Sequence, residues 1–311
     1  MTARGKTQRN DRGVVLLNAL VIVTALAAVA IRLLVITERD QSRLGAMRAA
    51  DQAALYLDAG ETLVTTVLEE DFRQSPDTDH LDELWAIEDY AVPIDRGVLS
   101  GRIYDLQGRF NINWLTDPDT VDSARAFERL ALSLRLDIRL AQAVIDYLRP
   151  GGPVNPTPYI NRPVPVRAQG GPILAIDELR VVPFMTAQAF ATLAPFISAL
   201  PFDSRLNVNT APPAVLAAFM PVAGQNGAAA LVRSRTKTPY GSAGDFVDRA
   251  TADLGAAVFA SVPAGRFTAA STWFMAVLES DLDGTRRRRM IVVHRSLDSG
   301  AVTPKYRMAL P

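Results

Sequence analysis

The sequence predicts an α+β protein in which a long N-terminal helix packs on a small antiparallel sheet, with a large all-α block inserted between strands. First, an uncharged apolar run at residues 14–31 continues as a helical pattern to about residue 73. Second, strand-like segments flank a helical middle region, before residue 112 and after residue 263. Each strand group is too small to bury a face alone, so together they are expected to form one sheet of four to five strands.

The first element is predicted to span a membrane. Residues 14–31 carry no charge, and the apolar stretch resumes after Arg32 up to residue 36. At about 1.5 Å per residue it can cross a bilayer core of roughly 30 Å. The basic residues of segment 1–13 predict a cytoplasmic N-terminus and an exported body.

The N-terminal segment has three competing interpretations. Residues 28–30 (Ala-Val-Ala) are typical of a cleaved secretory signal, whereas basic residues followed by Gly13 and an apolar helix favour a cut after Gly13 that leaves Val14 first. A plain anchor is the third. Apolar and small residues at spacings of four and three favour a helix that continues into the body, which argues against the secretory signal; they are Ala53, Leu57, Gly60, Val64 and Val67.

The body follows in order. A polar break at 76–82 precedes two predicted strands, 84–94 and 97–112. Helices are predicted over 124–150, with a break at 135–137, and over 175–200, where Asp177 and Thr186 are expected to cap the two helices. Strands return at 266–280, 286–298 and 302–310, joined by turns at 281–284 and 298–300. The predicted divisions are a cleaved basic leader (1–13), a transmembrane plus amphipathic helix (14–75), a β half (76–112 and 255–311) and an inserted helical domain (113–254).

Composition excludes several function classes. Lys+Arg and Asp+Glu are equal at 33 each; four of the basic residues and one acidic residue lie in 1–13, which leaves 29 against 32 in the rest. This balance does not indicate nucleic acid. There is no cysteine and there are two histidines, so a disulfide framework, a thiol metal site and a His-rich metal site are excluded. Because no nucleophile–base pattern occurs either, we expect no enzyme.

Residues 206–235 resemble a helix-hairpin-helix unit, with "NVNTA" before the first helix and "ALVRSR" on the second. In nucleic-acid binders the hairpin amides hold a phosphate, but here the turn reads "VAGQNG" and few basic residues surround it. Phosphate binding of this kind needs several Lys or Arg on one face. A structural or protein-binding use is therefore favoured, and no nucleic acid is expected.

The acidic stretch "ESDLDG" (279–284) imitates part of a calcium loop, but its twelfth position is Met290 where a glutamate is required. An EF-hand is rejected. Weak calcium binding by Asp281 and Asp283 stays a hypothesis, and no other cofactor is expected. The run Arg286–Arg289 is predicted to be a strand with two arginines on each face, paired with Glu279 and Asp281.

Five segments together resemble the minor pseudopilin K family of type II secretion: "RGVVLLNALVIVTALAAVA", "GRIYDLQGRFNINWL", "LAQAVIDYLRP", "AIDELRVVPFMTAQAFATLAPFISALP" and "LNVNTAPPAVLAAFMP". The resemblance extends from Arg12 to about Phe246. It implies a pseudopilin fold, with helix-hairpin-helix or SAM-like units in the insertion, and a single-pass protein of the bacterial inner membrane with a periplasmic body. It also implies that a prepilin peptidase cuts after Gly13 and methylates Val14.

The resemblance further implies a place at the tip of a pseudopilus, in complex with minor pseudopilins I and J and near other pseudopilins, supporting the export of folded proteins. Relatives with calcium or a disulfide exist, but no calcium ligands map onto this sequence. The alternative is a membrane-anchored helix-hairpin-helix receptor of the DNA-uptake kind, which predicts salt-dependent duplex binding.

Asn18 is the fifth residue counted from Val14. In most pseudopilins a glutamate at this position pairs with the N-terminal ammonium of a neighbour inside the bilayer, where an unpaired charge is costly. The K family resembles this chain in lacking that acid. A tip subunit has no subunit above it, so we interpret Asn18 as a residue that fits the tip position; the alternative is a merely tolerated polar residue.

Overall fold

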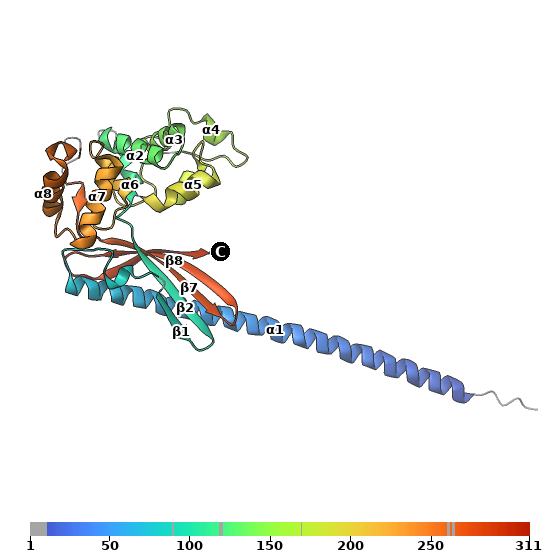
Figure 1. Ribbon diagram of the computed structural model, residues 1–311. Helices are drawn as coiled ribbons and strands as arrows, with labels where there is room; N and C mark the ends of the chain where they lie inside the picture. Colours follow the sequence, from blue (N-terminus) through green and yellow to red (C-terminus); the bar gives the residue numbers. More distant parts are fainter. Residues whose placement is uncertain (1–10, 89, 118–120, 169, 260–261, 263–264) are drawn as a thin grey trace, which may run out of the picture.

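The computed structural model describes residues 11–88, 90–117, 121–168, 170–259, 262 and 265–311. It consists of a long helix, a sheet packed on the C-terminal part of that helix, and a helical domain on the opposite side of the sheet (Figure 1). The predicted α+β fold class is confirmed.

Helix α1 (Asp11–Gln74) is continuous over 64 residues, as the sequence predicts. At 1.5 Å per residue it is about 96 Å long. Its N-terminal part projects away from the body (Figure 1), while Leu57, Val64 and Leu68 are buried against the sheet. It ends just before Pro76, whose ring prevents the preceding residue from continuing a helix.

The sheet has the strand order β1–β2–β7–β8–β9, and all its neighbouring strands are antiparallel. Along β7 buried and half-buried residues alternate, so one face packs on α1. The β7–β8 turn is Asp283-Gly284, both with positive φ (49° and 77°), which suits a two-residue hairpin. The strands are β1 (Tyr90–Ile94), β2 (Gly97–Asp105), β7 (Trp273–Leu282), β8 (Thr285–Arg295) and β9 (Val302–Leu310).

The prediction of a strand from residue 84 is wrong. Leu84–Ala86 forms the 3₁₀ helix η1, and the strand begins at Tyr90. The Trp85 ring is buried, meets the Phe274 ring edge-on at 5.3 Å, and its indole N–H donates to the Glu83 carboxylate at 2.7 Å. Burial of this one ring bends the segment into a helical turn, although its composition favours a strand.

The helical domain has its own core, in which the Phe110 ring stacks on Phe219 at 5.5 Å and meets Trp114 edge-on at 5.3 Å. Two short pairs of parallel strands connect the start and the end of this domain to its middle part. They are β3 (Phe110–Asn111) with β4 (Ile197–Ser198), and β5 (Leu206–Asn207) with β6 (Phe267–Thr268). Its helices are α2 (Val121–Ser133), α3 (Ile138–Leu148), α4 (Thr157–Ile160), α5 (Ala187–Leu193), α6 (Pro213–Phe219), α7 (Gly224–Lys237) and α8 (Ala243–Leu254), with the 3₁₀ helices η2 (Ile112–Thr116), η3 (Ile176–Val181), η4 (Ala194–Phe196) and η5 (Ala256–Phe259).

The predicted helix break at 135–137 is confirmed: Arg135 has φ 59°, and Asp137 caps α3 by accepting from the Arg139 amide. Thr186 caps α5 as predicted, accepting from the Ala189 amide at 3.0 Å. The prediction for Asp177 is wrong, because Asp177 lies inside the first turn of η3 and pairs with Arg180.

Candidate functional site

The N-terminal part of α1 is apolar and bare. Its residues from Val14 to Ile36 are exposed, and it forms a helix long and apolar enough, by length and composition, to cross a membrane. Asn18 lies within this exposed stretch, and the backbone of Gly13 is already helical. Of the predicted leader (1–13), residues 1–10 lie outside the described residues.

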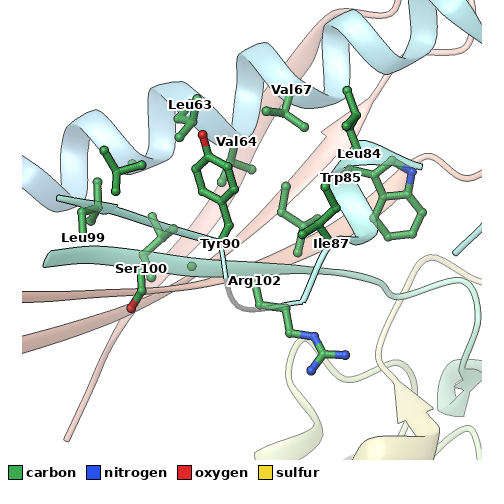
Figure 2. Close-up of a pocket in the computed structure, with 15 residues that line it drawn as sticks. Leu63, Val64, Val67, Leu84, Trp85, Ile87, Tyr90, Leu99, Ser100 and Arg102 are labelled. Atoms are coloured by element: carbon green, nitrogen blue, oxygen red, sulfur yellow. The ribbon is translucent and has the colours of Figure 1, made fainter. Parts of the chain in front are cut away.

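An apolar groove runs beside the C-terminal part of α1 (Figure 2). Its cavity volume is about 270 Å³. One wall is the flank of α1 around Leu63 and Val67, the other is the segment containing Leu84 and Ile87, and the floor is the inner face of β1 and β2. Leu84 is 68% exposed and Tyr90 50% exposed, so large apolar side chains border the groove in contact with solvent.

Two glycines give this groove its depth. A Cβ at Gly101 on β2 would lie 2.7 Å from a Leu278 methyl carbon, and one at Gly60 on α1 would lie 3.1 Å from another. Side chains at these positions would push Leu278 outward and fill the space above it. Because glycine has no side chain at these two positions, α1 can lie close to the sheet and the floor of the groove stays deep.

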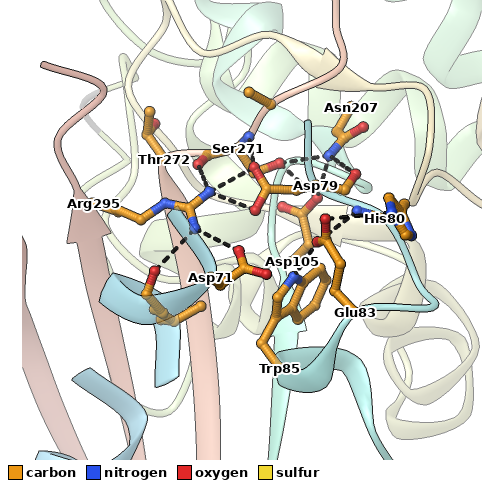
Figure 3. Close-up of polar contacts among 12 residues, drawn as sticks. Asp71, Asp79, His80, Glu83, Trp85, Asp105, Asn207, Ser271, Thr272 and Arg295 are labelled. Atoms are coloured by element: carbon orange, nitrogen blue, oxygen red, sulfur yellow. Dashed lines mark hydrogen bonds and ion pairs between the residues drawn. The ribbon is translucent and has the colours of Figure 1, made fainter. Parts of the chain in front are cut away.

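A buried ionic cluster lies where α1, the sheet and the helical domain meet (Figure 3). Arg295 on β8 is fully buried and donates to both carboxylate oxygens of Asp79, at 2.5 and 2.6 Å. It also donates to Asp71 of α1 at 2.9 Å and to the Ser271 carbonyl at 3.0 Å. One guanidinium thus joins the end of α1, the segment after it and the last turn before β7.

Asp105, at the end of β2, extends this cluster into the helical domain. One of its oxygens accepts from the Thr210 hydroxyl at 2.6 Å, the Ser271 hydroxyl at 2.7 Å and the Asn207 amide at 3.1 Å. Its other oxygen accepts from the Gln107 backbone amide. The "NVNTA" motif of the sequence therefore supplies Asn207 and Thr210 to a domain junction.

Carboxylates outnumber cations in this cluster. Burial raises the pKa of Asp79 to about 8 despite the attraction of Arg295, and burial also raises the pKa of Asp71, Glu83 and Asp105. Burial thus disfavours the charged form of these four carboxyl groups, while Arg295 binds Asp71 and Asp79.

Asp71, Asp79 and Glu83 also form a group with metal-ligand spacing, since one carboxylate oxygen of each lies within 4.8 Å of the others. The guanidinium of Arg295 already binds two of these three carboxylates. A basic side chain thus occupies the position that a cation would take.

The calcium candidates lie at the tip of the β7–β8 hairpin. Asp281 pairs with Arg286 at 2.9 Å, and Asp283 pairs with Arg96 at 3.1 Å. Calcium binding there stays a prediction. The arginine run behaves as predicted: Arg286 and Arg288 face Glu279 and Asp281 on one side of β8, whereas Arg289 binds Asp58 and Glu61 of α1 on the other.

The segment predicted to be a helix-hairpin-helix unit forms α6, a short turn and α7. Arg235 is 6% exposed and donates to the Val208 and Ala211 carbonyls at 2.6 and 2.7 Å, so it holds the preceding loop. Arg249 binds Asp245 and stacks over the Tyr240 ring. Two of the four basic residues in 206–250 are therefore engaged within the protein.

The groove and the ionic cluster were both missed by sequence reasoning. Asp71, Asp79 and Arg295 carry no local signal, because the partners are more than 200 residues apart in the chain. For the groove the available signal was Gly101 in a strand pattern, since a glycine there often marks a close approach of another element.

Comparison with known proteins gives consistent results. Two models described as "Type II secretion system (T2SS), protein K" match residues 108–202 and 206–265. Type II secretion system protein K of Aeromonas hydrophila is 28% identical over 94% of this chain and 96% of its own length. The Pseudomonas aeruginosa protein of the same name is 31% identical over 78% of each chain.

A chain of the solved GspK-GspI-GspJ complex from the type 2 secretion system of enterotoxigenic Escherichia coli has the same fold. The TM-score is 0.71 at 18% identity, and the match covers 86% of this chain and 99% of that one. The shared fold therefore extends over most of this chain and nearly all of that one. The chain belongs to the family of type II secretion system protein K.

Proposed function

We propose that the protein is a non-enzymatic minor pseudopilin at the tip of the type II secretion pseudopilus, where it supports pseudopilus assembly and export of folded proteins across the outer membrane. The observation that carries the proposal is the exposed apolar N-terminal part of α1, joined without a break to a pseudopilin body that bears a large helical domain. A single anchor helix suits lateral assembly in a membrane. The helical domain, at the end of the molecule remote from the anchor, suits a terminal subunit.

The proposal includes processing. Prepilin peptidase would cut after Gly13 and methylate Val14, leaving α1 as a single-pass anchor in the inner membrane with its body in the periplasm. The charge distribution supports this orientation, because four basic residues precede the apolar run. The N-terminal mass of the membrane-extracted protein tests it: methylated Val14 is expected, whereas a start at Ile31 would overturn it.

The proposed partners are minor pseudopilins I and J, together with the other pseudopilins. The full chain, co-expressed with I- and J-type partners and extracted in detergent, is expected to co-elute with both. Elution of the chain alone, with both partners folded, would overturn the assignment. Duplex DNA is expected not to bind at low salt, which distinguishes this function from DNA uptake.

Asn18 belongs to the same proposal. Because a tip subunit has no neighbour above it, it needs no carboxylate in the bilayer to neutralise that neighbour's ammonium. An amide costs less to keep in the apolar phase and still forms hydrogen bonds.

A further inference from the structure

A second groove lies in the helical domain, between the α2–α3 turn and α5, and its cavity volume is about 430 Å³. Its apolar lining includes Leu134, Leu136 and Leu140, and its polar lining includes Gln188 and Thr192, which lie on one face of α5. The groove belongs to the end of the helical domain that is remote from α7 and α8 (Figure 1). None of its lining residues comes from α1 or the sheet, so contacts made by those two parts leave it accessible.

The α2–α3 turn forms one edge of this groove and contains a residue in the left-handed region. Arg135, with φ 59°, lies just after α2. Its amide donates to the Leu132 carbonyl at 3.0 Å, and the Leu136 amide donates to the Ala131 carbonyl at 2.9 Å. This pair of bonds is typical of a Schellman helix end, where glycine is the usual residue because a side chain strains the backbone.

The turn before α5 forms the opposite edge. The Met185 amide donates to the Val182 carbonyl at 3.2 Å, with Pro183 and Phe184 between them, and Phe184 has φ 66°. Proline at the second position and positive φ at the third are features of a type II turn, which favours glycine at the third position. The Phe184 side chain is nevertheless 51% exposed. A large aromatic ring is thus held beside solvent at a position where glycine would avoid strain.

These two residues depart from the usual practice of this chain. Among the residues that the structure describes, positive φ occurs at nine glycines and at three other residues, of which the third, Asp283, lies in the β7–β8 turn. Arg135 and Phe184 both line the same groove. Because both are exposed, core packing does not account for them. Strain of this kind is concentrated at sites where a function needs the side chain.

The charge at the groove is not balanced within the protein. Asp137 pairs with Arg139 at 2.6 Å, and the Arg139 guanidinium also lies 4.9 Å from the centre of the Phe184 ring. Arg135 forms no ion pair with another residue that the structure describes. The groove therefore presents an exposed guanidinium beside an apolar surface, and this combination suits a ligand that carries a carboxylate next to an apolar group.

We propose that this groove binds an extended peptide segment of a partner protein, with a large apolar side chain against Leu134, Leu136 and Phe184 and a carboxylate on Arg135. The inference goes beyond the proposed function, because it assigns a binding surface to the helical domain. A peptide fits this lining better than a wholly apolar ligand does, since the Gln188 side chain can bond to peptide N–H and C=O groups.

The first experiment identifies the ligand chemistry without assuming a partner. A displayed library of random linear peptides is selected on the full chain in detergent, and enriched peptides are labelled and titrated by fluorescence anisotropy. They are expected to share a large apolar residue beside an acidic one, and to bind about tenfold more weakly to Arg135→Ala, which removes a charged hydrogen-bond donor. Arg233→Ala removes another exposed arginine of the helical domain, on α7, and is expected to bind them as the wild type does.

The second experiment uses the strained turn. Phe184→Gly removes the ring and supplies the residue that the turn favours, so the thermal midpoint is expected to equal or exceed that of the wild type. Binding of the same peptides is expected to fall about tenfold, as for loss of a large apolar contact. Phe202→Ala removes a similarly exposed ring (45%) outside the groove and is expected to leave binding unchanged.

Three results would overturn the inference. The first is a selection that enriches no peptide, or enriches peptides without an acidic residue. The second is wild-type binding by Arg135→Ala or Phe184→Gly, and the third is a marked fall in the thermal midpoint of Phe184→Gly, which would assign the ring to packing. No I- or J-type partner takes part in these measurements, so their failure leaves the proposed function standing.

Discussion

Arg295 is the central residue of the junction between α1, the sheet and the helical domain. It is fully buried, and it contacts carboxylates from α1 and from the segment that follows it. Removing one partner of a buried ion pair leaves uncompensated charge in an apolar environment. Arg295→Met is therefore expected to lower the free energy of unfolding by about 3–5 kcal/mol, measured by chemical denaturation of the full chain in detergent.

The matched control for this variant is Arg286→Met. The Arg286 side chain is 72% exposed and pairs with Asp281 across the β7–β8 hairpin. Exposed pairs contribute little, so a much smaller loss than that of Arg295→Met is expected. Equal losses from the two variants would contradict a special role for the buried cluster.

Asn18 gives a second prediction at this scale. Asn18→Glu places a carboxylate inside the bilayer where a tip subunit has no ammonium to pair with it, whereas Asn18→Leu removes the amide without adding charge. The glutamate variant is expected to reduce recovery of the complex with I- and J-type partners more than the leucine variant. The reverse order would show that the tip position does not explain Asn18.

At the scale of elements, α1 serves two roles along one continuous helix. Gly45 lies between the bare anchor and the packed segment, and a Cβ there would meet nothing within 4 Å. Gly45→Pro is expected to kink the helix, since proline removes a backbone donor and clashes with the preceding turn. The body should keep its thermal midpoint, and co-purification of the partners from membranes should fall.

Gly45→Ala is the control, because it raises helix propensity by roughly 0.5–1 kcal/mol without a kink. It should match or exceed the wild type in both measurements. A loss of body stability in Gly45→Pro would instead show that this position contributes to packing.

Elements whose pattern is local were predictable from the sequence. The continuous α1, the break at 135–137 and the Asp283-Gly284 turn follow from periodicity and turn chemistry. The 3₁₀ turn at Leu84–Ala86 was not predictable, because it depends on burial of the Trp85 ring against Phe274, nearly 190 residues further along the chain.

At the scale of the whole molecule, stability is expected to depend on pH through the carboxyl cluster. The pKa of Asp79 is raised to about 8 from 3.8 by burial, so the folded state holds this proton more tightly than the unfolded state. Such a group stabilises fully below pH 3.8, and this contribution is lost as pH rises through about 8. The thermal midpoint should therefore fall between pH 6 and pH 9.

Asp79→Asn should make the thermal midpoint less dependent on pH, even if the substitution also changes the midpoint itself. A wild-type midpoint that is constant from pH 6 to pH 9 would mean that the cluster carries no extra proton. The site as a whole was less predictable than the fold, because Asp79, Asp105 and Arg295 come together through sheet register and domain docking.

The position of the helical domain between β2 and β7 has one more consequence. Asp105 and Phe274 are direct partners in an antiparallel pair, so the chain leaves and re-enters the sheet at one point. Topologically the whole domain is the turn of a β-hairpin. An insertion at such a point leaves the strand order unaltered. A sheet of this kind can therefore carry a different inserted domain without any change to the surface on which α1 packs.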